Sequence, residues 1–148
     1  MFNDAIKMTG NFKLVLTDEN GNIKQEEEVK NLVVTVGKNY IASRMKDATA
    51  TAMTHMEVGT SSTAAAVGDT ALVAAVASSR VTLTSTTVTT NSVAYVASFP
   101  AGTGTGALTE AGIFNASSSG TLLCRTVFSV INKGAADTLG ITWTVTVN

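Results

Sequence analysis

The end of the chain alternates between apolar residues and threonine. Ile141, Trp143, Val145 and Val147 occupy every second position, and threonines fill the positions between them. Successive side chains of a β-strand point to opposite faces of a sheet, so this spacing predicts a strand with one buried and one wet face. We expect Trp143 and Val145 to lie in the core, together with Phe128 from the preceding apolar run.

Similar alternation predicts three antiparallel pairs of strands earlier in the chain. The paired runs are residues 11–17 with 23–29, 81–84 with 93–99, and 110–115 with 121–131. Asn20 and Gly21 indicate a tight turn in the first pair, because both residue types tolerate positive φ. We expect the polar residues 86–92 to connect the second pair, and residues 53–58 to form a further strand.

One segment, residues 35–47, has the spacing of a helix. Its repeating positions are Val36, Tyr40, Ile41, Arg44 and Met45, and Thr35 is a suitable N-cap. A single helical turn is also expected to begin at Asp69 or Thr70.

Many short strands, one short helix and Gly-, Ser- and Thr-rich connections predict a mainly β protein. We expect an antiparallel β-sandwich or jelly-roll-like domain. The 148 residues suit a single domain. We assign residues 1–10 to an N-terminal arm and residues 11–148 to the sandwich, divided into a charged hairpin and helix (11–47) and a β body (48–148).

Charge is concentrated at the start of the chain. Fourteen of the 21 charged residues precede position 48, and the remaining seven are Glu57, Asp69, Arg80, Glu110, Arg125, Lys133 and Asp137. A surface with so little charge is typical of a protein that is covered by partners. The net charge of −1 and the lack of a basic cluster argue against nucleic-acid binding. The longest apolar run, residues 71–77, is far shorter than the ~20 residues of a membrane span.

Residues with catalytic or metal-binding chemistry are sparse. His55 is the only histidine, and Cys124 is the only cysteine; we expect them to be a strand residue and a core residue. Gly102, Gly104 and Gly106 lack the following Lys-Ser/Thr of a phosphate-binding loop. We therefore expect no enzyme activity, no cofactor and no metal site.

Two other sets of charged residues carry specific expectations. Glu26, Glu27 and Glu28 are interpreted as a solvated sheet edge that discourages aggregation. Glu110 and Arg125 are expected to lie opposite each other across the third strand pair, as a cross-strand ion pair.

The order of motifs over residues 10–147 resembles a family of small structural proteins of tailed bacteriophages. The motifs are Asn31-Leu-Val-Val-Thr-Val-Gly37, Val58-Gly-Thr-Ser-Ser-Thr63, Gly68-Asp-Thr-Ala-Leu72, Glu110-Ala-Gly-Ile-Phe-Asn115, Ile131-Asn-Lys-Gly134 and Ile141-Thr-Trp-Thr144. Members of this family resemble capsid decoration (cement) proteins, and also modules of tail adaptors and tail fibres. The short chain, without shaft sequence, favours decoration.

The resemblance implies a protein made in a bacterial host cytoplasm and carried on the virion. It would bind the outer capsid surface, with the major capsid protein as partner, as a homotrimer that stabilises the shell. The alternatives are a tail adaptor or fibre-tip module, and a host-glycan-binding module that uses the Gly/Ser/Thr-rich loops and exposed Tyr95 or Trp143. We expect the arm to bind the capsid through Phe2, Ile6 and Met8. The other candidate contacts are the hairpin around Asn20 and Gly21 and the loops at 59–70.

Overall fold

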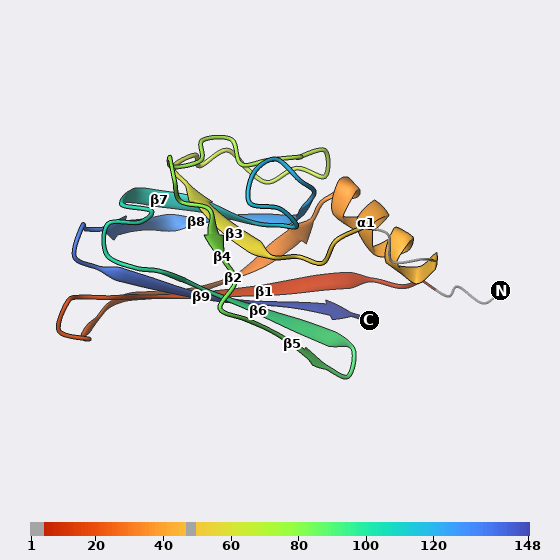
Figure 1. The fold of residues 1–148 in the computed structure, drawn as a ribbon, viewed down its shortest axis with the longest axis horizontal. Coiled ribbons are helices and arrows are strands. Elements are labelled where there is room, and N and C mark those ends of the chain that lie inside the picture. Colours follow the sequence, from red (N-terminus) through yellow and green to blue (C-terminus); the bar gives the residue numbers. More distant parts are fainter. Residues whose placement is uncertain (1–4, 47–49) are drawn as a thin grey trace.

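A computed structural model of the chain describes residues 5–46 and 50–148. Within them, nine antiparallel strands form one curled sheet, with a single helix at one end (Figure 1). The elements are β1 (Met8–Thr17), β2 (Ile23–Val33), α1 (Thr35–Lys46), β3 (His55–Gly59), β4 (Val81–Thr82), β5 (Ser85–Thr89), β6 (Ser92–Phe99), β7 (Gly106–Phe114), β8 (Leu122–Lys133) and β9 (Thr138–Val147). The mainly β class is thus confirmed, and the helix expected at 35–47 is confirmed over Thr35–Lys46.

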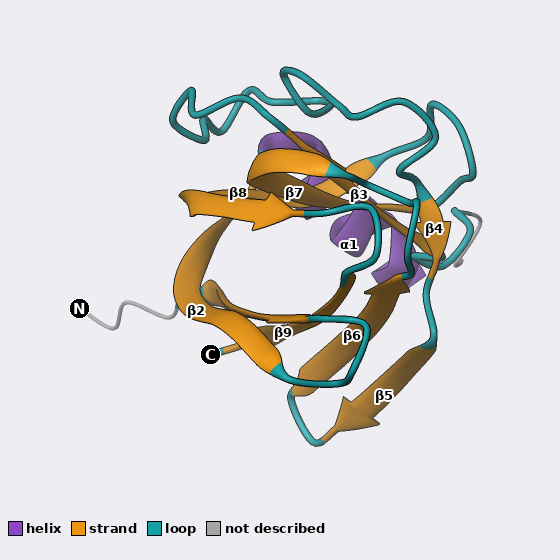
Figure 2. Cartoon of the chain, turned by 90° about the vertical axis from the view of Figure 1, so that its left-hand side faces the viewer, coloured by secondary structure: helices purple, strands orange, loops and turns teal. Residues whose placement is uncertain are grey.

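The strands follow the order β4-β3-β7-β8-β2-β1-β9-β6-β5. The sheet curls so that its two halves face each other (Figure 2). β2 is the strand at which the sheet bends. Most of β2 pairs with β1, but its last residues, Leu32 and Val33, pair with Arg125 and Cys124 of β8.

The three glutamates of β2 lie before the stretch that pairs with β8. At their positions β2 pairs with β1 alone, because its pairing with β8 is confined to Leu32 and Val33. Glu26 and Glu28 are exposed there, as predicted for a solvated edge. Where β2 and β8 separate, side chains link the two strands instead. The Glu27 carboxylate accepts a hydrogen bond from Ser129 N at 3.1 Å, and Gln25 Nε2 donates to Val130 O.

Several local predictions were wrong. The strand pair expected between residues 81–84 and 93–99 is replaced by other pairings, since β4 pairs with β3 and β6 pairs with β5 and β9. Residues 86–89 of the expected 86–92 connection belong to strand β5; its side chains are all exposed, so it shows no apolar alternation. The expected helical turn after Asp69 is absent, because the N–H groups of Val73 and Ala74 bond to the Glu110 carboxylate. β1 also begins at Met8, so residues 8–10 of the assigned arm belong to the sheet.

Aromatic rings join the two halves of the sheet. The ring of Phe12 in β1 stacks on Phe128 of β8 at 5.2 Å between centroids, and packs edge-on against Trp143 of β9 at 4.8 Å. Trp143, Val145 and Phe128, the three predicted core residues, are all buried. The indole Nε1 has no hydrogen-bond partner among the described residues.

A second, smaller apolar cluster lies apart from this main core. Val34, Leu72, Phe114 and Leu122 form it, so it joins the start of α1, the loop before β4 and the β7–β8 pair. Gly37 lets α1 approach β8 closely, since a side chain there would collide with the carbonyl of Leu123.

We expect Trp143→Ala to lower the free energy of unfolding by about 3–5 kcal/mol, because it leaves a large cavity beside Phe12. Denaturant unfolding followed by circular dichroism measures the change. Trp143→Phe is the control: it keeps an aromatic ring and removes the unpaired N–H, so it should retain most of the stability. A loss below about 1 kcal/mol for the alanine variant would contradict the packing described.

Candidate functional site

A long loop, residues 60–80, crosses the outer face of the β7–β8 pair and connects β3 to β4 (Figure 1). It contains no helix or strand and two charged residues, Asp69 and Arg80. Loops of this length without secondary structure need other partners for their backbone polar groups. Buried charged side chains provide them.

Glu110 of β7 is fully buried beneath the loop. Its Oε1 accepts hydrogen bonds from Ala74 N at 2.7 Å and Ser61 N at 3.4 Å, and its Oε2 accepts one from Val73 N at 3.1 Å. One carboxylate thus satisfies backbone groups at both ends of the loop. Gly59 is required here, because a Cβ would lie 2.5 Å from Glu110 Oε1.

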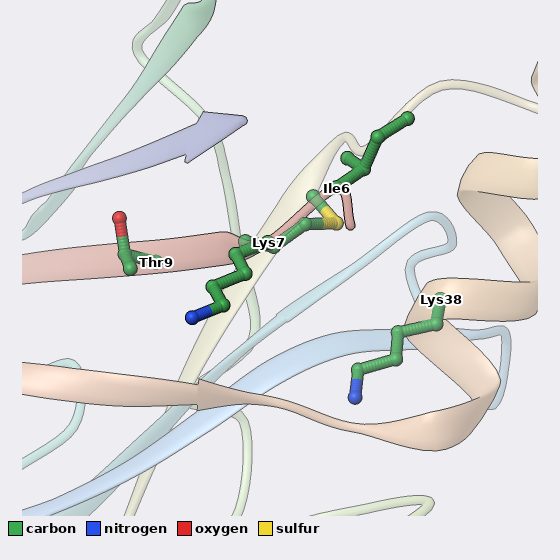
Figure 3. Close-up of a pocket in the computed structure, with 5 residues that line it drawn as sticks. Ile6, Lys7, Thr9 and Lys38 are labelled. Atoms are coloured by element: carbon green, nitrogen blue, oxygen red, sulfur yellow. The ribbon is translucent and has the colours of Figure 1, made fainter. Parts of the chain in front are cut away.

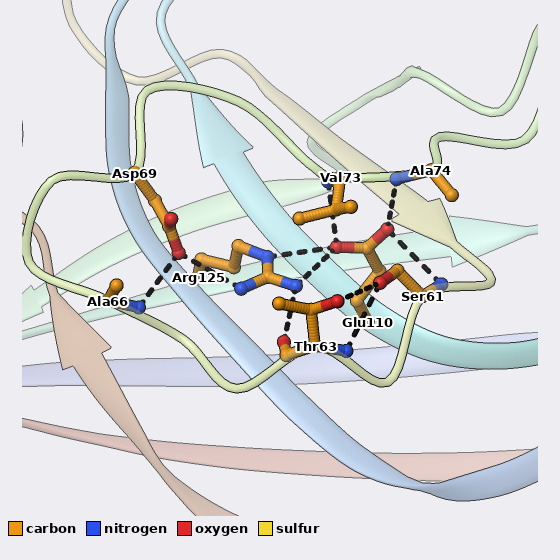
Figure 4. A network of polar contacts seen from close by, with 8 residues as sticks. All are labelled: Ser61, Thr63, Ala66, Asp69, Val73, Ala74, Glu110 and Arg125. Atoms are coloured by element: carbon orange, nitrogen blue, oxygen red, sulfur yellow. Dashed lines mark hydrogen bonds and ion pairs between the residues drawn. The ribbon is translucent and has the colours of Figure 1, made fainter.

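Arg125 of β8 balances the charge of Glu110 and extends the network (Figure 4). Its Nε and Nη2 each lie 2.8 Å from Glu110 Oε2. Nη1 donates to Asp69 Oδ2 at 2.9 Å, and Nη2 donates to the carbonyl of Thr63 at 2.8 Å. The guanidinium therefore holds the middle of the loop, while Glu110 holds its ends.

The two residues expected to pair do form an ion pair, but not from directly opposite positions. Gly112 is the register partner of Arg125, and Val127 is the partner of Glu110. The side chains therefore meet diagonally. The sequence did not indicate Asp69 as a third member of this ion-pair network, because its partner Arg125 lies on β8, far away in the sequence.

The loop exposes apolar side chains on its outer surface. Val67 and Val73 are 54% and 55% exposed, whereas Leu72 between them points into the small cluster. Because the carboxylate and guanidinium fix the backbone, these valines are held in place above the sheet.

The other charged residues of the β body also hold loops. Arg80 pairs with Glu57 at 2.9 Å, lies 3.7 Å above the Phe114 ring, and donates to the carbonyl of Ser119 in the β7–β8 connection. Buried Lys133 donates to the carbonyls of Pro100 and Asp137; burial lowers the pKa of its ammonium.

All seven charged residues of the described segment 50–148 thus lie in such contacts. None is more than 19% exposed. Their charges are used inside the protein, and the surface of the β body is left to small, hydroxyl and apolar side chains.

Two of the three predicted capsid-contact residues, Ile6 and Met8, lie around the start of β1. Phe2 is outside the described residues. Ile6 is 74% exposed, whereas Met8 packs partly against the core. Ile6 and Met8 line a groove of about 480 Å³ with Lys7, Thr9 and Lys38 of α1 (Figure 3).

The residues with potential catalytic chemistry do not converge. His55 Nδ1 lies 2.7 Å from Thr54 Oγ1, and Cys124 is in the core, where burial raises the pKa of its thiol. Burial likewise raises the pKa of Tyr95 to about 12. Within residues 5–46 and 50–148, no group of three or more His, Cys, Asp or Glu side chains is placed to hold a metal ion.

Comparisons with known proteins identify no relative: no family model, curated protein or solved structure matches the chain. None of the helical residues described forms a segment long and apolar enough to cross a membrane.

Arg125→Met should lower the free energy of unfolding by about 3–5 kcal/mol, because it leaves the Glu110 carboxylate buried without its counter-charge. In a double-mutant cycle with Glu110→Gln, which keeps one acceptor oxygen, we expect the double variant to lose less than the sum of the single losses, with a coupling above ~1 kcal/mol. Denaturant unfolding measures the stability of the native protein, of the two single variants and of the double variant. Asp69 lies at the more exposed end of the network, so Asp69→Asn should lower the free energy of unfolding by at most about 1 kcal/mol. Stability losses of Arg125→Met and Glu110→Gln that simply add in the double variant would refute the coupling.

The Asp137 site predicts a pH dependence. A hydrogen bond from Lys24 at 2.7 Å, and another from Gly134 N, hold the pKa of Asp137 below its ordinary value. The folded state then binds fewer protons than the unfolded state, so this stabilisation is complete above about pH 4 and is lost as the pH falls further. We expect Asp137→Asn to be less stable than the native protein at pH 7, and the difference to shrink below about pH 4.

Lys24→Met is the matched variant for this test, since it removes the same hydrogen bond from the other side. Its stability difference from the native protein should narrow over the same pH range. Urea midpoints measured from pH 7 to pH 2 provide the comparison, and a difference that stays constant throughout would contradict the assignment.

Proposed function

We propose that this protein is a capsid decoration protein of a tailed bacteriophage. It would bind the outer surface of the assembled shell and stabilise it, with the major capsid protein as its partner. The observation that supports this proposal best is the absence of exposed charge on the β body: its seven charged residues all hold loops or strands. A folded surface normally carries many exposed charges, so such a body suits extensive contact with other proteins.

The anchored loop is the part of this surface that we assign to the capsid. Its backbone is already ordered by Glu110 and Arg125, so docking Val67 and Val73 would cost little further conformational entropy. Rigid apolar contacts of this kind favour binding without a change of shape. The charged hairpin β1–β2 and helix α1 would then remain in solvent.

Four of the six motifs that carry the phage-protein resemblance meet around this loop. Residues 60–63 and 68–72 form parts of it, residues 110–115 supply Glu110, and residues 31–37 supply Val34 to the cluster beneath. Segments far apart in the sequence therefore contribute to one surface. This convergence supports a shared role for the motifs.

The proposal includes the sandwich architecture and the homotrimer expected from the resemblance. The contact of Phe12 with Phe128 across the curled sheet supports a sandwich-like arrangement of its two halves. A trimer at three-fold positions of the shell would bridge neighbouring capsid subunits.

Stabilisation of the shell would follow from mass action. A protein that binds only the assembled, expanded lattice stabilises it by about 2.7 kcal/mol per site when its concentration is 100 times Kd. Repeated over many sites, this contribution would resist the pressure of the packaged DNA.

The alternative is a tail adaptor or fibre-tip module. Its glycan-binding form relied on exposed Tyr95 or Trp143 for stacking on sugars, but both side chains are buried. Copy number in purified virions distinguishes the remaining possibilities, since decoration requires hundreds of copies and a tail component only about a dozen.

We expect the double variant Val67→Asp/Val73→Asp to lose at least about tenfold in affinity for capsids that lack the protein, because each substitution places a charge in an apolar contact. Co-sedimentation with such capsids measures binding, and circular dichroism checks the fold. Ile23→Asp, at another exposed apolar position near the hairpin, is the control and should bind normally. Normal binding of the loop variant together with weak binding of the control would move the contact to the hairpin.

The same assay tests the arm. Deletion of residues 1–6 removes Phe2 and Ile6 and leaves strand β1 intact, unlike a deletion of residues 1–10. If the loop alone supplies the contact, the truncated protein should bind as the full chain does; weaker binding would assign part of the contact to the arm.

A further inference from the structure

The two outer edges of the curled sheet differ in whether another strand can pair with them. At one edge, β3 is covered by β4 and by the loop: Thr60 N donates to Ala74 O, and Val76 N donates to Val58 O. At the other edge, β5 pairs with β6 alone among the described residues. Figure 2 shows β5 standing at this margin of the molecule.

β5 lacks the charged residues, proline and bulges that protect many edge strands. Charged residues, proline and bulges discourage pairing with other strands. β5 reads Ser-Thr-Thr-Val-Thr, its pairing with β6 is regular, and residues 81–109 contain no charged residue. Val88 of β5 is 70% exposed.

We infer that β5 pairs with β5 of a second copy of this chain, antiparallel, about a two-fold axis at Thr87. Thr87 would then lie opposite its own equivalent, Thr86 opposite Val88, and Ser85 opposite Thr89. Each pair combines residues suited to strands, and no like charges meet. Val88, which shares a face with Val93 of β6, would be covered by Thr86 of the other copy.

The occupant is a second copy pairing through the same strand, because the outermost strand at the other end of the sheet, β4, is only two residues long. A head-to-tail chain of molecules would need a second edge long enough to pair with β5, and β4 does not provide one. Two-fold pairing uses both free edges and stops at two copies. In a trimeric decoration protein, this contact would link one trimer to the next.

The contact is small, so its strength depends on concentration. A pair of five-residue strands buries less than the roughly 1,200 Å² of a stable interface. We therefore expect weak association in dilute solution and a larger paired fraction where copies are crowded on one surface.

Disulfide formation tests the register. Residues directly opposite across antiparallel strands have Cα atoms about 4.5–5.5 Å apart, within reach of a disulfide. Thr87→Cys should therefore form covalent dimers on mild oxidation of concentrated protein. Val88→Cys is the control. The Cα atoms of its two copies would lie about 8 Å apart, so this variant should give a several-fold lower yield of covalent dimer. The native Cys124 is buried and does not interfere.

Charge substitution tests the association itself. Thr87→Glu and Thr87→Lys each place like charges opposite each other, and each should weaken association about tenfold or more, whereas an equal mixture of the two should restore it. Thr142→Glu, exposed on the central strand β9, is the control and should associate as the native protein does. Sedimentation velocity at high concentration measures the doubling of the mass seen in dilute solution.

Equal disulfide yields at the two positions, or association unaffected by Thr87→Glu, would overturn the inference. So would a native protein that shows no doubling of mass at the highest concentration, about 1 mM, a level comparable to the effective concentration of linked copies. Because these measurements use free protein without capsids, they bear on strand pairing and leave the capsid-binding proposal to its own assay.

Discussion

The buried ion pair between Glu110 and Arg125 is the contact on which the outer surface of the β body depends. Three backbone N–H groups of the long loop bond to this glutamate, and the arginine binds the loop's middle through Thr63 and Asp69. Burying two charges is costly, and their attraction alone offsets only part of that cost. The additional bonds to the loop make the arrangement favourable, and they also fix where Val67 and Val73 stand.

The same use of charge extends through the β body. Arg80 fixes the β7–β8 connection, and Lys133 with Asp137 fixes the turn between β8 and β9. Each charged group replaces hydrogen bonds that a strand or helix would otherwise provide. The result is that residues 50–148 have fixed loops and almost no exposed charge, whereas the two middle strands of the sheet, β1 and β2, with the turn between them, and helix α1 carry most of the charged residues. This asymmetry underlies both the proposed capsid contact and the unprotected edge at β5.

A protein with this surface would gain from assembly in two ways. Apolar loop residues would be covered by a partner, and the free backbone groups of β5 would be satisfied by a second copy. Both contacts are small compared with a stable two-protein interface. They become effective when many copies bind one lattice, because each bound copy raises the local concentration of the next.

The sequence by itself determined the β class, the helix Thr35–Lys46, the first hairpin and the core position of Trp143, because these follow from local periodicity and turn chemistry. It also indicated Glu110 and Arg125, two rare charges on adjacent strands. Only the tertiary structure decided their diagonal register, the recruitment of Asp69, and the edge position of β5. Those features depend on which distant segments lie side by side, and a strand exposed on both faces, such as residues 85–89, leaves no hydrophobic period to read.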